Sequence, residues 1–193
     1  MRTFLALEIS PAIRQSVASV LESLAQQVPN RIVRWVRPEN VHLTLAFLGD
    51  LPGESLPQVQ EAVQTAAIGI PPLHLSVGGL GAFPRPQAPR VIWIGVQEPT
   101  GRLSALEARL EEGLRRLGWE PPDEPFRPHL TLGRVRRGAP RSDVERLAAS
   151  LQTGASGDVG SMIAPEVVVF RSELTPAGAV YTRLAAVPFQ AAE

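Results

Sequence analysis

The same four residues, His-Leu-Thr-Leu, occur twice in this 193-residue chain, at positions 42–45 and 129–132. Each copy follows a proline-containing segment and lies in a run of apolar and β-branched residues, which is typical of a β-strand. Alternate side chains of a strand share one face. The first copy should therefore present His42 and Thr44 on one side and turn its two leucines into a core. The second copy should do the same.

Two of the chain's three histidines lie in these tetrapeptides. A single histidine on a strand is usually structural, but chance would rarely place two in identical tetrapeptides with matching flanks. We therefore predict that His42 and His129 are functional residues. His74, in Leu-His-Leu-Ser, has no matching partner, and we expect it to be structural or to lie on the surface.

Two imidazoles suit displacement at phosphorus, which needs a base on the entering oxygen and an acid on the leaving oxygen. Imidazole titrates near neutrality, so one ring can be neutral while the other is protonated. Thr44 and Thr131 are candidates for hydrogen bonds to the non-bridging phosphate oxygens, and Arg134 would neutralise the developing charge. These three residues and the two histidines form the predicted site.

Other chemistries fit the sequence less well. A metal centre would need a third ligand, and neither tetrapeptide has an Asp or Glu at a liganding spacing, so we expect no metal and no cofactor. The nucleophile elbow Gly-x-Ser-x-Gly of serine hydrolases is absent. The chain has no cysteine, which excludes thiol nucleophiles, and no lysine, which excludes the nucleotidyl-lysine chemistry of ATP-dependent ligases.

The distribution of charge suggests an anionic ligand. The net charge is zero, which argues against non-specific binding of duplex nucleic acid over a large surface. All 19 basic residues are arginine, and many of them flank the two tetrapeptides. We expect a local positive funnel for an anion such as phosphate, which a guanidinium binds with two hydrogen bonds. The flanking residues are Arg31, Arg34, Arg37, Arg127, Arg134, Arg136, Arg137 and Arg141.

The pattern of apolar residues predicts strands and helices without a strict βαβ alternation, which favours an α+β fold with mostly antiparallel sheets. The glycine- and proline-rich segment 78–89 is predicted to be a long loop. Strands are predicted at 1–9, 32–36, 41–48, 73–77, 90–96, 129–135, 165–170 and 179–187, and helices at 11–28, 55–68, 103–117 and 142–151.

At this length the chain suits one large domain or two intimately packed lobes. The repeated tetrapeptide favours a single bilobal domain over residues 1–193, with one motif in each pseudo-symmetric lobe. No apolar run reaches the twenty or so residues that span a bilayer. We expect the first residues to form a strand and not a signal peptide. We expect a cytoplasmic monomer that does not bind membranes.

The motifs in their context resemble the 2H phosphoesterase superfamily, and most closely the RNA 2′,3′-cyclic phosphodiesterases, also called 2′-5′ RNA ligases. Residues 35–49 (WVRPENVHLTLAFLG) are similar to the first family motif and 126–134 (FRPHLTLGR) to the second. The opening segment 2–7 and the pattern Ser-x-Leu-x-x-x-Gly-x-x-Tyr at 172–181 also match, so the likeness covers nearly the whole chain. Gly133 stands where the family pattern has alanine.

This resemblance implies a LigT-like fold, α+β, with two pseudo-symmetric lobes whose mostly antiparallel sheets face each other across a central cleft. It also implies hydrolysis of a terminal RNA 2′,3′-cyclic phosphate to a 2′-phosphate. His42 would then be the proton donor and His129 the proton acceptor. The residues alone leave this order open, because both histidines have the same sequence environment. ATP-independent 2′-5′ joining of RNA ends, such as tRNA halves, is implied as a second activity.

Two alternatives remain open at this point. One is a phosphodiesterase for a small cyclic nucleotide or a nucleotide-sugar phosphate, because the sequence shows no long track for RNA. The other is a module that binds an RNA end without reaction. If the ligand carries a base, aromatic side chains are expected to stack on it. The candidates are Phe47, Phe126 and Tyr181.

Overall fold

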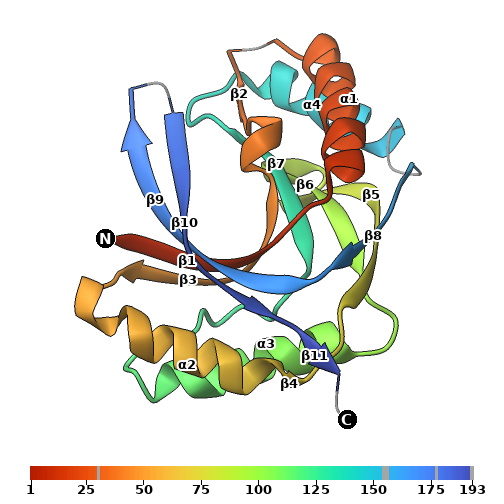
Figure 1. Ribbon diagram of the computed structural model, residues 1–193. Helices are drawn as coiled ribbons and strands as arrows, with labels where there is room; N and C mark the ends of the chain where they lie inside the picture. The colour runs from red at the N-terminus through yellow and green to blue at the C-terminus, as the bar shows by residue number, and fades with distance from the viewer. Residues whose placement is uncertain (30, 154–156, 177, 192–193) are drawn as a thin grey trace.

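The computed structural model describes residues 1–29, 31–153, 157–176 and 178–191. Nine of the described strands form one sheet, in the order β10-β9-β1-β3-β7-β6-β5-β8 with β2 paired to β7, and β4 and β11 form a separate two-stranded sheet. All pairings within the nine-stranded sheet are antiparallel, and the short β4–β11 pair is parallel. Figure 1 shows the sheet curling between two groups of helices. The α+β, mostly antiparallel prediction is confirmed.

The predicted elements occur in the predicted order, but the strands β4, β8 and β11 were not predicted. The strands are β1 (Arg2–Glu8), β2 (Val33–Trp35), β3 (His42–Asp50), β4 (Ile68–Gly69), β5 (Leu73–Arg85), β6 (Ala88–Gln97), β7 (His129–Val135), β8 (Asp158–Ala164), β9 (Glu166–Thr175), β10 (Gly178–Pro188) and β11 (Gln190–Ala191). The helices are α1 (Pro11–Gln27), α2 (Leu56–Ala67), α3 (Arg102–Arg115) and α4 (Arg141–Thr153), with short 3-10 turns η1 (Pro38–Asn40) and η2 (Gly53–Ser55).

The sheet consists of two halves that meet where β3 lies beside β7. The first half contains β10, β9, β1 and β3, and the second contains β7, β6, β5 and β8, with β2 alongside. The pairing between the halves joins Leu43 to Leu130, the second residue of each tetrapeptide. The repeated motifs therefore lie on neighbouring strands of one continuous sheet, one in each half.

Each half of the sheet is covered by a helix that follows a strand of the other half. Helix α1 comes directly after β1, yet it contacts β8 and α4, and α4 contacts β6 and β5. Helix α3 follows β6, yet it packs on α2, which contacts β10. The buried faces of these helices and the motif leucines belong to one apolar core. This exchange of helices ties the two halves together.

The prediction of a loop over 78–89 was wrong. Residues up to Arg85 continue β5, and they form a hairpin with β6. Glycine inside a strand often marks a close approach of another group. Gly81 lies opposite Trp93, and a Cβ atom at this position would come within 2.2 Å of the Trp93 ring. Gly81 therefore makes room for an indole and does not break the strand.

None of the described helices is long and apolar enough to cross a membrane.

We expect Gly81→Ala to destabilise the protein by about 1–3 kcal/mol, because the added methyl group overlaps the Trp93 ring. The measurement is the free energy of unfolding in urea. Gly53→Ala is the matched control, since a Cβ atom there meets nothing within 4 Å. Equal stability of the two variants would show that the indole does not pack over Gly81 in solution.

Candidate active site

The two motif strands have the alternation that their sequences predict. Leu43 and Leu130 are each 1% exposed and lie in the core, while the histidine and threonine of each motif are half-buried on the opposite face. The strands run antiparallel through the Leu43–Leu130 pair. Each histidine therefore lies beside the threonine of the other motif. The structure brings His42, Thr44, His129 and Thr131 together on one face of the sheet.

Both imidazoles are held in the same way. Nδ1 of His42 lies 2.8 Å from the carbonyl oxygen of Asn40, and Nδ1 of His129 lies 2.6 Å from that of Arg127. A carbonyl oxygen only accepts, so Nδ1 carries the hydrogen in each ring. Nε2 is then the nitrogen left to exchange a proton with a ligand.

Sequence reasoning did not predict the backbone support that Asn40 and Arg127 give to the histidines. Both occupy the position two residues before a motif histidine, in the turn segments whose sequence indicates only where a strand begins. Asn40 is itself anchored, because its side-chain amide donates to the carbonyl oxygen of Ala179 at 2.8 Å. Strand β10 thus helps to position His42.

A β-bulge follows the threonine in each motif strand. Opposite β1, Leu45 is the extra residue of β3, and opposite β6, Leu132 is the extra residue of β7. The burial pattern over the first six residues is the same in both strands. A bulge shifts the following side chain to the other face. Phe47 and Arg134, each five residues after a motif histidine, consequently share the face of the histidines.

Arg134 links the two halves of the site. Its positive charge lowers the pKa of His129 on its own strand and also opposes the rise in the pKa of Tyr181, which comes from β10. Tyr181 in turn lies edge-on to His42, with ring centroids 5.3 Å apart. The guanidinium therefore lies within electrostatic reach of groups around both histidines.

His42 lies in an aromatic environment. Its ring stacks on Phe4 at 4.7 Å and contacts Tyr181, while Phe4 stacks on Phe170 at 5.2 Å. Burial lowers the pKa of His42 from 6.5 to about 4, against the raising effect of the hydrogen bond to Asn40. His42 is therefore neutral in the free protein at pH 7. Sequence reasoning missed Phe4 and Phe170, since nothing in the sequence links these distant strands to His42.

His129 has a different environment. Phe83 meets its ring edge-on at 5.0 Å, and the guanidinium of Arg127 lies 6.0 Å from the Phe83 ring. Burial lowers the pKa of His129, and the charge of Arg134 lowers it further, while the hydrogen bond to Arg127 opposes both. Phe83 comes from the segment whose composition predicted a loop.

The remaining predicted residues are divided. Phe47 is 63% exposed beside Phe4, with ring centroids 5.9 Å apart, and is open to a ligand. Tyr181 packs against the small cluster around Phe4, and burial raises its pKa. Phe126 is half-buried against the main core. His74 is exposed on β5, as expected for a surface residue.

Two arginines do not belong to the expected funnel. Arg31 pairs with the buried carboxylate of Asp143 at 3.4 Å, and Arg141 pairs with Glu145 at 2.8 Å. Both pairs involve α4, so these guanidinium groups brace a helix. The prediction of a funnel therefore holds at most for the arginines on β2 and β7 and in the segments next to them.

Close packing against β2 explains why a glycine occupies position 133. After the bulge it faces β2, and a Cβ atom would come within 2.8 Å of Val33 Cγ1 and 2.9 Å of Trp35 Cε3. Alanine would require both side chains to shift. The departure from the family pattern therefore belongs to the contact between β2 and β7 and not to the chemistry.

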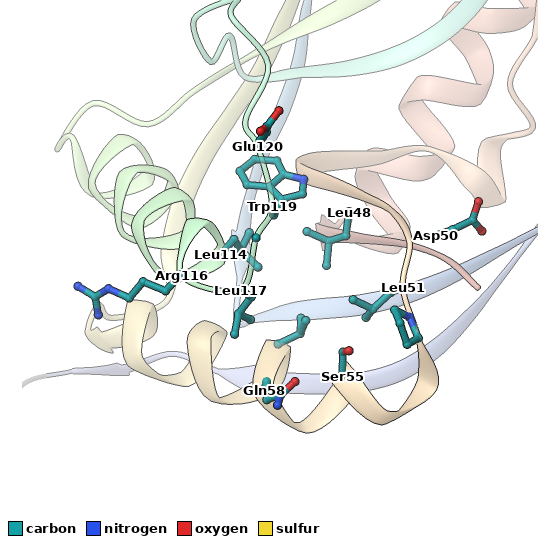
Figure 2. A pocket seen from close by; sticks show the side chains of 13 residues that line it. Leu48, Asp50, Leu51, Ser55, Gln58, Leu114, Arg116, Leu117, Trp119 and Glu120 are labelled. Carbon is teal, nitrogen blue, oxygen red and sulfur yellow. The ribbon is translucent and has the colours of Figure 1, made fainter.

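Two surface grooves lie away from the histidines. The larger, about 720 Å³, is lined by Leu48, Leu117 and Trp119 among others, between α2 and the end of α3 (Figure 2). Trp119 donates its indole N–H to the carbonyl oxygen of Phe47 at 2.7 Å, which links one wall of this groove to β3. The smaller, about 410 Å³, lies between α2 and β10. Within the described ranges, no three His, Cys, Asp or Glu residues are placed to hold a metal ion.

The depressed pKa of His42 predicts a pH-dependent stability. Protonation favours the unfolded chain, where the pKa is near 6.5, so the contribution of neutral His42 is fully present above that pH and is lost as the pH falls toward 4. We expect the free energy of unfolding of wild type to fall by about 2–3 kcal/mol more than that of His42→Gln between pH 7 and pH 4. Parallel curves for the two proteins in urea titrations would contradict the burial of the ring.

Comparison with known proteins identifies relatives of this chain. The sequence profile described as LigT like Phosphoesterase matches the chain twice, over residues 7–93 and 94–181. Proteins named RNA 2′,3′-cyclic phosphodiesterase from Methanothermobacter thermautotrophicus and Archaeoglobus fulgidus are each 36% identical to it. They cover 94% and 95% of this chain, and the alignments cover 95% and 98% of the relatives.

Solved structures of two similar proteins have the same fold. TT0787 of Thermus thermophilus superimposes with a TM-score of 0.81 at 28% identity over the whole of both chains. The LigT protein of E. coli in complex with 3′-AMP superimposes with a TM-score of 0.76 at 25% identity over 97% of each chain. The two profile matches divide the chain so that each contains one His-Leu-Thr-Leu motif. The chain is therefore an enzyme that belongs to the LigT-like phosphoesterase family.

Proposed function

We propose that this phosphoesterase is a metal-independent RNA 2′,3′-cyclic phosphodiesterase that opens a terminal cyclic phosphate to a 2′-phosphate. The observation that carries the proposal is the pair of neighbouring histidines, each tethered through Nδ1 so that Nε2 is available for proton transfer. The names of the relatives with 36% identity support the same substrate.

In the proposed reaction, His129 accepts a proton from water as the water oxygen bonds to phosphorus. The bond from phosphorus to the 3′ oxygen breaks, and His42 donates its proton to that oxygen. Thr44 and Thr131 donate hydrogen bonds to the non-bridging oxygens, and Arg134 balances the charge that develops on them. The product is an RNA end with a 2′-phosphate and a free 3′-hydroxyl.

A proton donor must be protonated when it acts, whereas burial lowers the pKa of His42 and keeps it neutral in the free protein at pH 7. The cyclic phosphate carries a negative charge, and a negative charge beside an imidazole raises its pKa. We therefore propose that the bound substrate itself promotes protonation of His42. The assignment of His42 as donor and His129 as acceptor follows the family resemblance.

The same geometry would serve ATP-independent ligation. A 5′-hydroxyl in place of water attacks phosphorus and forms a 2′-5′ linkage, while the 3′ oxygen again leaves with a proton. RNA halves, such as those of a cleaved tRNA, would be the partners. The lysine-free sequence is consistent with this route, because a nucleotidyl-lysine intermediate cannot form.

Replacing either His42 or His129 by alanine should lower kcat about 10²–10⁴-fold on a short RNA that ends in a 2′,3′-cyclic phosphate, because each removes one proton transfer. His74→Ala, which removes the exposed third histidine, is the matched control and should retain activity. The assay contains excess EDTA, and the product is assigned as 2′- or 3′-phosphate. Loss of wild-type turnover in EDTA, or a 3′-phosphate product, would contradict the proposal.

A sulfur atom in place of the 3′ oxygen separates the two histidine roles, because a thiolate leaves without a proton. With this substrate the His42→Ala variant should recover most of its activity and His129→Ala should not. The reverse pattern would assign the donor role to His129. Thermal unfolding of both variants establishes that they are folded.

Phe47 is the best placed of the three candidates for stacking on the terminal base, since it is exposed on the face of the histidines. Stacking contributes about 1–3 kcal/mol per base. We expect Phe47→Ala to raise KM about tenfold with little change in stability, because 1.4 kcal/mol corresponds to a factor of about ten. Ile163→Ala on β8, another exposed apolar residue, is the control. An unchanged KM would show that Phe47 does not stack on the base and would leave Tyr181 and Phe126 as the candidates.

A further inference from the structure

Arg34 occupies a position that the predicted site did not include. Strand β2 pairs with β7 so that Arg34 lies directly opposite Arg134. The neighbouring residues of both strands face the core, because a Cβ atom on Gly133 would touch Val33 and Trp35. Arg34 and Arg134, which are both exposed, therefore share the other face, which is the face of the histidines.

Like charges directly opposite each other on neighbouring strands repel. The surrounding protein does not relieve this repulsion, because neither guanidinium pairs with a carboxylate of the residues that the structure describes. Several other arginines do have an acidic neighbour within 4.0 Å: Arg31, Arg115, Arg116, Arg141, Arg146, Arg171 and Arg183. Two adjacent guanidinium groups without such a neighbour, on the ligand face, form a site for more than one negative charge.

The two arginines lie side by side on neighbouring strands, but only Arg134 has an electrostatic effect on the groups of the predicted site. Arg134 acts electrostatically on both His129 and Tyr181, so it lies next to the catalytic pair. Strand β2 pairs with residues 133–135 of β7, whereas β3 pairs with Leu130. Arg34 therefore lies beside Arg134 on β2, level with residue 134 of β7 and not with the motif residues 129–131, and its charge, unlike that of Arg134, affects the pKa of neither His129 nor Tyr181.

We propose that Arg34 binds the phosphodiester that precedes the terminal nucleotide, and so makes the enzyme select RNA ends over cyclic mononucleotides. This inference rests on the proposed function and names its substrate class. A cyclic mononucleotide occupies only the histidines, threonines and Arg134. An oligonucleotide also has the phosphodiester that precedes the terminal nucleotide, and the guanidinium of Arg34 binds this group.

The test compares a trinucleotide that ends in a 2′,3′-cyclic phosphate with the cyclic mononucleotide of the same base. We expect Arg34→Gln to lower kcat/KM for the trinucleotide about tenfold and that for the mononucleotide less than twofold, because only the trinucleotide has the phosphate with which this guanidinium forms a charged hydrogen bond. Arg134→Gln should lower both values to a similar extent. Arg116→Gln, which changes an exposed arginine at the end of α3, is the control for loss of one positive charge.

Salt dependence gives a second readout that a structural role would not change. Each phosphate contact to a single strand contributes about 0.7 to the slope of log affinity against log salt. The slope for the trinucleotide should fall by about this amount in Arg34→Gln and should not change in Arg116→Gln.

Equal losses on both substrates would overturn the inference and place Arg34 on the cyclic phosphate itself, and no loss on either would also overturn it. If wild type turns over neither substrate, the proposed function fails. Titration of wild type and Arg34→Gln with a trinucleotide that ends in a phosphate then decides the inference separately. Weaker binding by the variant supports a phosphate contact, and equal binding overturns it.

Discussion

The site depends on one backbone pairing, between Leu43 of β3 and Leu130 of β7. This pair joins the two halves of the sheet into one. Because both leucines are 1% exposed in the core, the residues on either side of them must turn to the opposite face. The histidine of each motif then lies beside the threonine of the other. A register shift of one residue would bury the histidines and threonines and expose the leucines.

The two motifs are identical and their β-bulges are equivalent, but the residues that follow the bulges differ and make the site asymmetric. Both bulges follow the threonine, yet one turns Phe47 and the other Arg134 toward the face of the histidines. The first half of the site is consequently aromatic around His42 and the second half is basic around Arg134. The two imidazoles have the same tether but different surroundings, which allows them to take different roles in one reaction.

Sequence patterns predicted most of the strands and helices, because apolar periodicity reflects which face of an element is buried. They failed at segment 78–89, where glycine and proline usually indicate a loop. There Gly81 accommodates Trp93, and the strand delivers Phe83 to His129. Only the partner across the hairpin distinguishes these two uses of glycine. The supporting residues Asn40, Phe4 and Phe170 were likewise invisible, since each acts through contacts that the sequence pattern does not contain.

By itself, the sequence determined which groups are candidates for the chemistry. Two identical tetrapeptides at strand spacing point to His42 and His129, each with a threonine on the same face, and the absence of lysine and cysteine excludes lysine and thiol nucleophiles. Only the tertiary structure decided how these groups differ. Their pKa values, the orientation of Phe47 and Arg134, and the pairing of Arg34 with Arg134 depend on burial and on cross-strand register. These are set by residues far away in the sequence, so no local pattern contains them.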